Sequence, residues 1–177
     1  MYKTVKQQLK EIKVHQDTIV NESFRLTDIQ IEKTNKPNNK VLCGFIADGE
    51  YSGLIATKIS TKYMKPCIIF NNVLDDSDML KGSIRGFGVD DFRRDINETG
   101  LARCEGHDNA AGITCKKSNL NDLIEVINQK YKDVEFKLDI NVDLKLNYAD
   151  VNEKLINKLN KINKLSGHGF KPVSICM

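Results

Sequence analysis

Two short apolar runs constrain the fold more than any other feature of the sequence. Val41–Ile46 is apolar on both alternating faces, which predicts a buried central strand, and Cys67–Phe70 predicts a second strand. Between them, Gly53–Tyr63 has helical periodicity, with Ser52 as its expected cap. The inward face of this helix would hold Leu54, Ile55 and Ile59. A strand, a helix and a strand at this spacing predict a βαβ unit with a parallel pair and a right-handed crossover.

The glycine-rich segment that follows predicts shorter elements. A strand is expected through Ile84–Phe87, followed by a helical turn that Asp90 or Asp91 caps. The stretch "GLARCEGHDNAAGITCKK" predicts a strand, a glycine-bounded turn and another strand through Gly112–Lys116.

Three further elements are expected toward the C-terminus. A helix capped by Ser118 or Asn119 would carry an apolar face of Leu120, Leu123, Ile124, Ile127 and Tyr131. Strict alternation from Phe136 to Leu146 predicts a half-exposed strand that leaves one domain and enters the next. A last helix would carry Val151, Leu155, Leu159 and Ile162 on one face.

The N-terminal segment predicts a helix that needs a neighbour. Its narrow apolar stripe, at 3/4/3 spacing, consists of Tyr2, Val5, Leu9 and Ile12. A stripe of that width requires tertiary packing, which a larger protein would provide. The polar loop Thr34–Lys40 marks the boundary to the apolar segment beyond it.

Composition excludes several classes of protein. The chain has 177 residues, enough for one domain with extensions or two small domains. The net charge of +3 permits a nucleic-acid partner without requiring one. The longest apolar run, "VLCGFIA", is far shorter than the ~20 residues of a membrane span, and the charged start lacks the apolar core of a signal peptide. Five sparse cysteines favour reduced thiols in the cytoplasm over a disulfide framework.

Cys104 and His107 raise the question of a metal site. Structural zinc usually needs two close ligand pairs, and neither a CxxC motif nor a second pair is present. With three histidines in the chain, a two-metal hydrolytic site also lacks ligands. Cys104 and Cys115 are therefore expected to be small buried residues of adjacent strands, and no nucleophile signature is found. No metal-binding and no catalytic residue is predicted in this chain.

An anion-binding site is the remaining candidate. The segments "GSIR" (Gly82–Arg85) and "GHDNAAG" (Gly106–Gly112) bring glycine, arginine and histidine to two strand ends. Glycine lets backbone N–H groups approach a phosphate, and arginine offers a two-pronged donor to it. Ala110 and Ala111 leave room where larger side chains would block a ligand. Each segment alone is equally typical of a tight turn.

Residues from about 40 to 140 resemble the DHHA1 domain of the DHH phosphoesterase superfamily. The resemblance rests on "GLIATKISTKYMKPCIIF", "KGSIRGF" and "GLARCEGHDNAAGITC", the last of which is similar to a GGHxxAAG motif. The tail "LINKLNKINKLSGHGFKPVSI" resembles the segment that follows DHHA1 in RecJ exonucleases. Glu105 departs from the pattern, because it stands where the motif has its first glycine, and it would place a carboxylate near the phosphate path. The loop "DGEYSG" and the turn "SGHGFKP" also depart from the usual sequences.

The resemblance implies an α/β fold: a DHHA1-type mixed β-sheet flanked by helices, with an N-terminal linker helix and a C-terminal connector towards a missing OB-like domain. It implies a linker helix region at 1–36, a DHHA1 substrate-binding domain at 37–140, and a connector strand, helix and start of a following domain at 141–177.

The same resemblance implies the function. The chain would hold single-stranded DNA, or a short oligonucleotide, for an upstream DHH catalytic domain that carries Mn²⁺ or Mg²⁺ and performs 5′-to-3′ exonuclease cleavage in the cytoplasm. The residues that would bind the phosphates or support that contact are Ser83, Arg85, Gly106, His107, Asn109, Ala110, Ala111 and Gly112. Two alternatives stay open: a DHHA1 domain of a small-nucleotide or cyclic-dinucleotide phosphodiesterase, and a non-catalytic adaptor. No cofactor is expected in this chain, and no membrane partner.

Overall fold

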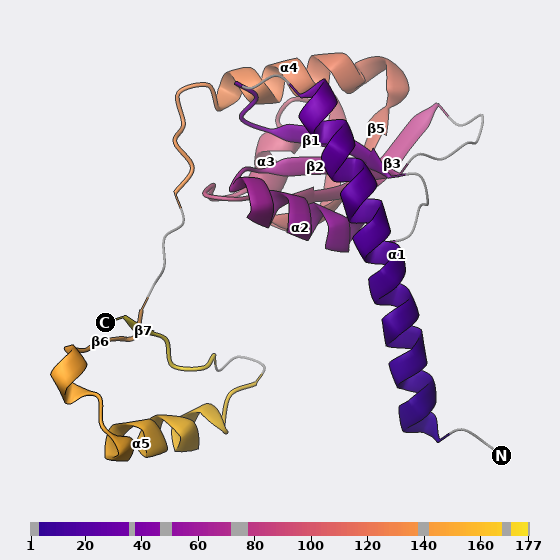
Figure 1. The fold of residues 1–177 in the computed structure, drawn as a ribbon. Helices are drawn as coiled ribbons and strands as arrows, with labels where there is room; N and C mark the ends of the chain where they lie inside the picture. Colours follow the sequence, from indigo (N-terminus) through magenta and orange to yellow (C-terminus); the bar gives the residue numbers. More distant parts are fainter. Residues whose placement is uncertain are drawn as a thin grey trace. The chain divides into compact units, whose positions relative to one another are not determined.

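A computed structural model describes residues 4–35, 38–46, 51–71, 78–137, 142–167 and 171–176 (Figure 1). The chain divides into two compact units, Met1–Leu138 and Asp139–Met177. The first unit contains the sheet and the predicted site.

The first unit is built on a mixed five-stranded sheet with the order β1-β2-β3-β5-β4. Its strands are β1 (Leu42–Ile46), β2 (Cys67–Asn71), β3 (Met79–Arg85), β4 (Ala102–His107) and β5 (Ala110–Lys116). β1 and β2 are parallel, and all other pairs are antiparallel. The predicted parallel pair and the mixed sheet are confirmed, whereas the strand expected at Ile84–Phe87 begins earlier and ends at Arg85.

Helices cover both faces of this sheet, and the sheet separates the core into two layers. Side chains at alternating positions of β2 point to opposite faces, so Cys67 and Ile69 pack with α2 (Ser52–Tyr63), while Ile68 and Phe70 pack with α4 (Leu120–Lys130). These four side chains have no exposed surface, and full burial of an isoleucine or phenylalanine side chain contributes about 1.5–3 kcal/mol.

Strand β1 lies at one edge of the sheet, so the predicted central position is wrong. The helix α1 (Val5–Thr34) covers that edge with polar side chains. The Asn35 side chain accepts from the Cys43 N–H at 3.1 Å and donates to the Cys43 carbonyl at 2.9 Å, and Gln30 accepts from the Phe45 N–H at 2.8 Å. The backbone groups that an edge strand leaves unpaired are thus satisfied, which explains how an apolar strand can stand at an edge.

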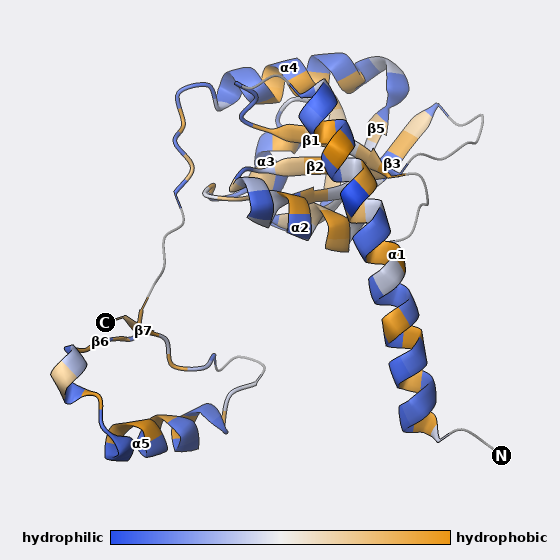
Figure 2. Cartoon of the chain, in the orientation of Figure 1, coloured by the Kyte–Doolittle hydropathy of each residue, from blue (hydrophilic) through white to orange (hydrophobic). Residues whose placement is uncertain are grey.

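The predicted N-terminal helix is confirmed, and its two halves differ. In the second half Val20 and Ile31 are buried against the sheet and α2. In the first half, Val5, Leu9 and Ile12 are 70%, 61% and 65% exposed. Figure 2 shows that hydrophobic and hydrophilic positions mix along this part of α1. Within the described residues of the first unit, nothing covers these three side chains.

Three details of the helix ends differ from prediction. Tyr51, in the left-handed region with φ of 69°, precedes α2, and Ser52 forms no cap. Leu54 is 45% exposed, and Ala56 is buried with Ile55 and Ile59 instead. A 3-10 turn at Lys117–Asn119 leads into α4 without a side-chain cap. The cap of α3 (Phe92–Asn97) is confirmed, because Asp91 accepts from the Arg94 N–H at 2.8 Å.

The second unit is small and exposed. It contains β6 (Leu144–Lys145) and β7 (Ile175–Cys176) as a parallel pair, a 3-10 turn (Tyr148–Asp150) and α5 (Glu153–Asn163). The last helix is confirmed, and Asn152 caps it through the Leu155 N–H. The long strand expected from Phe136 to Leu146 is wrong where the structure describes it, since only Leu144–Lys145 is strand; residues 138–141 lie outside the described residues. In the described ranges, no helix has the length and apolarity to cross a membrane.

Candidate functional site

The predicted site residues meet at one end of the three strands β3, β5 and β4. The register places Arg85 opposite Ala110, and Ala110 opposite His107. One row further along, Ser83 faces Gly112, and Gly112 faces Glu105. Because side chains alternate, these residues share the face that α2 covers only in part, while their neighbours Ile84, Ala111 and Cys104 enter the opposite core layer.

The middle strand of this face carries small side chains. Ala110 and Gly112 are exposed, and larger residues flank them on β3 and β4. We call this strip of small side chains between larger ones the trough, and define it by the rows Arg85–Ala110–His107 and Ser83–Gly112–Glu105. Ala111, predicted to shape this surface, is 5% exposed and belongs to the core on the other side of the sheet.

Arg85 is held at the start of α2. Its Nε donates to Thr57 Oγ1 at 2.9 Å, and its Nη1 donates to the Ile84 carbonyl at 2.7 Å. A Cβ on Gly53 would lie 3.0 Å from Arg85 Nη2, so the glycine makes room for the guanidinium. The first turn of the 12-residue helix contains no acidic residue, and its positive end adds to the charge of Arg85. An anion at this end of the trough would meet a fixed arginine and a helix N-terminus together.

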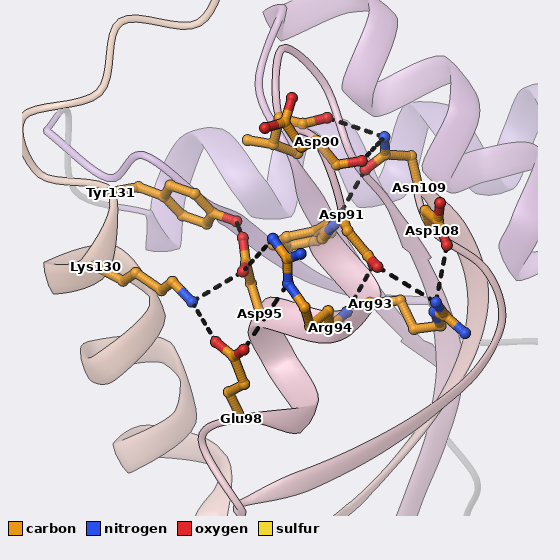
Figure 3. Close-up of polar contacts among 12 residues, drawn as sticks. Asp90, Asp91, Arg93, Arg94, Asp95, Glu98, Asp108, Asn109, Lys130 and Tyr131 are labelled. Atoms are coloured by element: carbon orange, nitrogen blue, oxygen red, sulfur yellow. Dashed lines mark hydrogen bonds and ion pairs between the residues drawn. The ribbon is translucent and has the colours of Figure 1, made fainter.

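The turn of the β4–β5 hairpin is fixed by Asn109 (Figure 3). Its side-chain amide donates to the carbonyls of Val89 and Asp90 at 2.9 and 3.1 Å and accepts from the Phe92 N–H at 3.2 Å. Its backbone carbonyl accepts from the Gly86 N–H at 2.9 Å. With these bonds formed, Asn109 positions the hairpin rather than presenting its amide to a ligand.

Charged side chains also connect the hairpin turn to α3, and α3 to the end of α4. The Arg93 guanidinium lies between Asp108 at 2.8 Å and Asp91 at 3.3 Å, which joins the hairpin turn to the start of α3 (Figure 3). Asp95 accepts from Lys130 at 2.9 Å and from the Tyr131 hydroxyl. Burial, and then the hydrogen bond to Asp95, raise the pKa of Tyr131, which therefore stays protonated as a donor.

Gly106 has a backbone that other residues rarely adopt. Its φ is +138°, and a Cβ there would lie 2.9 Å from Ala111 Cα on the paired strand. The glycine that the sequence singled out for close approach to a ligand is therefore required by the hairpin itself. Gly112 is different, because a Cβ there would meet nothing closer than the Glu105 carbonyl at 3.8 Å.

Cys104 and His107 do not form a pair. Cys104 is 4% exposed and Cys115 is 1% exposed, as predicted for small residues of adjacent strands, whereas His107 is exposed on the trough. The two residues are three positions apart on β4 and so point to opposite faces. Within the described ranges no group of three or more His, Cys, Asp or Glu side chains is arranged to hold a metal ion.

The thiols predict a simple labelling pattern. Burial raises the pKa of Cys67 and of Cys104 to about 12, so at pH 8 only roughly 10⁻⁴ of each is thiolate, the reactive form. Exposed Cys176 should therefore be alkylated by iodoacetamide long before either of them, as measured by peptide mass spectrometry. Urea should abolish the difference. Rapid native labelling of Cys67 would contradict the buried core described above.

Several residues of the site were not predicted. Thr57 and Gly53 position Arg85, and Lys81, Arg103 and Thr114 continue the trough beyond Ser83. The sequence could have suggested Lys81, because residues two apart on a strand share a face and Lys81, Ser83 and Arg85 follow this spacing. The partners across the sheet depend on strand register, which no local motif encodes.

Comparisons with known proteins agree with the fold. No protein-family model matches the chain. A putative SPbeta prophage-derived single-strand DNA-specific exonuclease, YorK, of Bacillus subtilis strain 168 is 34% identical over 160 residues, and its counterpart in Bacillus phage SPbeta is equally similar. The alignment covers 85% of this chain and 28% of each relative, so the chain spans less than a third of their length.

RecJ structures are among the solved structures that match in fold. RecJ from Thermus thermophilus in complex with Mn²⁺ superposes with a TM-score of 0.68 and 15% identity over 94% of this chain and 25% of that one. An exonuclease RecJ bound to manganese gives a TM-score of 0.52 and 16% identity, over 73% of this chain and 31% of that one. In fold the chain resembles RecJ, and in sequence it resembles a putative single-strand DNA-specific exonuclease, so the resemblance predicted from its motifs is confirmed.

Proposed function

We propose that this chain is the strand-holding part of a RecJ-like single-strand DNA-specific exonuclease and binds the phosphate backbone in its trough. The observation that carries the proposal is the row Arg85–Ala110–His107, in which two donor side chains flank a small residue beside the N-terminus of α2. Backbone phosphates are the ligands for which arginine and a helix N-terminus are suited. Bases of a single strand remain free to turn away from such a contact.

Hydrolysis is assigned to a different part of the whole protein. The relatives are more than three times as long as the segment matched here, and the two RecJ structures carry manganese. A DHH-type catalytic domain holding Mn²⁺ or Mg²⁺ would receive the strand that the trough presents. The proposed role of this chain is thus binding and orientation of the substrate.

The division into a linker helix (1–36), a strand-binding domain (37–140) and a connector (141–177) belongs to this proposal. Support comes from α1, whose first half carries an exposed apolar stripe, as expected of a helix that packs against a further domain. The exposed, weakly packed second unit supports a connecting role for the last segment.

The proposal is tested by fluorescence anisotropy of a labelled oligothymidylate. The logarithm of the binding constant is expected to fall linearly with the logarithm of the salt concentration, because each phosphate contact releases counterions from the DNA. Replacing Arg85 with alanine removes a charge-assisted contact and should lower the affinity about tenfold or more. His107→Ala should lower it by a smaller factor.

Lys132→Ala is the matched control, because it removes one positive charge from an exposed residue beyond α4, on the opposite side of the sheet. An Arg85→Ala protein that binds the oligonucleotide as tightly as the control at low salt would overturn the proposal. Preferential binding of a cyclic dinucleotide over the longer strand would favour the alternative function, a domain of a small-nucleotide phosphodiesterase. Binding of neither would favour a protein-binding adaptor.

A further inference from the structure

From the Ser83–Gly112–Glu105 row the trough leads into a hollow, and apart from Gly112 the residues that line this hollow are not part of the predicted site. This hollow has a volume of about 640 Å³. The residues that line it come from β3, β4 and β5: Met79, Lys81, Gly82, Arg103, Glu105, Gly112, Ile113 and Thr114. Lys81 is four residues from Arg85 on β3, which separates the two positions by roughly 13 Å along the strand.

Two cationic side chains flank a hydroxyl in this hollow. The register places Thr114 between Lys81 on one neighbouring strand and Arg103 on the other. Lys81 is exposed, and its ammonium group makes no hydrogen bond or ion pair with any described residue. This third row resembles the first row, because a side chain that can donate hydrogen bonds stands on either side of a smaller residue.

Glu105 stands between the two cationic rows. It faces Gly112, which has no side chain to cover it, and its carboxylate contacts Arg103 at 2.6 Å. Both side chains are largely exposed, at 71% for Glu105 and 81% for Arg103. An ion pair so open to water contributes little stability, so an anion of suitable geometry can take the place of the carboxylate.

We propose that Lys81, Thr114 and Arg103 form a second phosphate subsite for the same DNA strand, and that Glu105 weakens it by competing for Arg103. This inference rests on the proposed function and deepens it. Arg85 and His107 bind one phosphate, and the strand continues over Gly112 to the second subsite. Only an oligonucleotide that is long enough to reach across the Glu105 row gains the second contact.

The prediction is a length-dependent effect of substitution. Affinities for a 5′-phosphorylated thymidine dinucleotide and for an octanucleotide are measured by competition against a labelled strand. Lys81→Ala and Arg103→Ala should weaken octanucleotide binding roughly three- to tenfold and leave dinucleotide binding unchanged. Glu105→Gln should strengthen octanucleotide binding roughly threefold, again with no change for the dinucleotide.

Charge-matched controls come from the opposite side of the sheet. Lys132→Ala matches the loss of a positive charge, and Glu125→Gln matches the loss of a negative one, because both residues are exposed and remote from the trough. All variants change exposed side chains, and circular dichroism melting curves verify that each one folds like the parent.

The outcomes separate this inference from the proposed function. If Arg85→Ala weakens both ligands while Lys81→Ala and Arg103→Ala bind the octanucleotide like their controls, the second subsite is wrong and the proposed function stands. If Glu105→Gln weakens octanucleotide binding, the competing role of Glu105 is wrong. If Arg85→Ala also leaves both affinities unchanged, the second subsite and the proposed function fail together.

Discussion

Replacing Gly82 with alanine is expected to destabilise the protein by more than about 3 kcal/mol, a large part of the roughly 5–15 kcal/mol that a domain has in total. A Cβ at this position would lie 2.2 Å from the Ile69 carbonyl oxygen and 2.7 Å from Phe70 Cα. Both atoms belong to the backbone of β2, the paired strand, and a backbone cannot move aside as the end of a long side chain can. Strand β3 must therefore separate from β2 to accept even one methyl group.

Gly112→Ala is the matched comparison. The substitution is the same, the strand is a neighbour in the same sheet, and the nearest atom to the new Cβ would be 3.8 Å away. Its free energy of unfolding should stay within about 0.5–1 kcal/mol of the parent, as measured by urea denaturation. Because the added methyl group stands in the trough between Ser83 and Glu105, single-stranded DNA binding should nevertheless weaken, roughly tenfold for a loss of 1.4 kcal/mol.

These two glycines thus separate a structural requirement from a functional one. Equal destabilisation by both substitutions would contradict the packing described for Gly82. Undiminished DNA binding by the Gly112→Ala protein would contradict the trough as the path of the strand.

The elements that the sequence predicts well are those set by neighbours in the chain. Cys67–Phe70 is apolar enough to be a strand wherever it pairs. The turn expected in the segment Gly106–Gly112 is also present, although it is shorter than expected, because β5 already begins at Ala110. The position of Val41–Ile46 at the sheet edge is not determined by its neighbours in the chain. It depends on Gln30 and Asn35, polar residues of a helix and its C-terminal end, which satisfy the edge that a central strand would have paired.

The alternating run that begins at Phe136 was predicted to be a strand, and the structure shows why that prediction is wrong. Period-two patterning predicts a strand only if another strand is available to pair with it, because an isolated strand leaves its backbone groups unsatisfied. In the described residues before 138 the chain is irregular, and Phe136 packs against the core, with its ring 5.7 Å from that of Tyr131. Burial of that ring, rather than pairing of the backbone, determines the local structure.

The sequence predicts which residue types form the candidate site, but it does not predict how they are arranged in space. Residue type identifies Arg85 and His107, and the structure brings them to one row across three strands. The sequence suggests openings for a ligand at Gly106 and Ala111, but backbone geometry explains the first and core packing the second. Thr57, which fixes Arg85, lies on a helix far from both motifs in sequence, and only the packing of α2 on β3 reveals it.

Asn109→Ala is expected to destabilise the protein by about 2–4 kcal/mol, because it removes three side-chain hydrogen bonds that contribute about 0.5–1.5 kcal/mol each. The loss falls on the segment between β3 and α3, whose carbonyls at Val89 and Asp90 then depend on water. Asn109→Asp should be no better, since a carboxylate would replace the amide donor against those two carbonyls. The hairpin end that carries His107 would be held less firmly, so DNA binding should also weaken.

Urea denaturation gives the stability, and hydrogen exchange locates the change, because the Phe92 amide loses its acceptor and should exchange faster in the Asn109→Ala protein. Asn121→Ala provides the control, since Asn121 is exposed on α4 and the same substitution there favours a helix. A stability within about 0.5 kcal/mol of the parent, with slow exchange at Phe92, would show that the hairpin is positioned without Asn109. Retained DNA binding in a clearly destabilised variant would instead separate the hairpin turn from the strand's path and leave Arg85 as the determinant of the first phosphate.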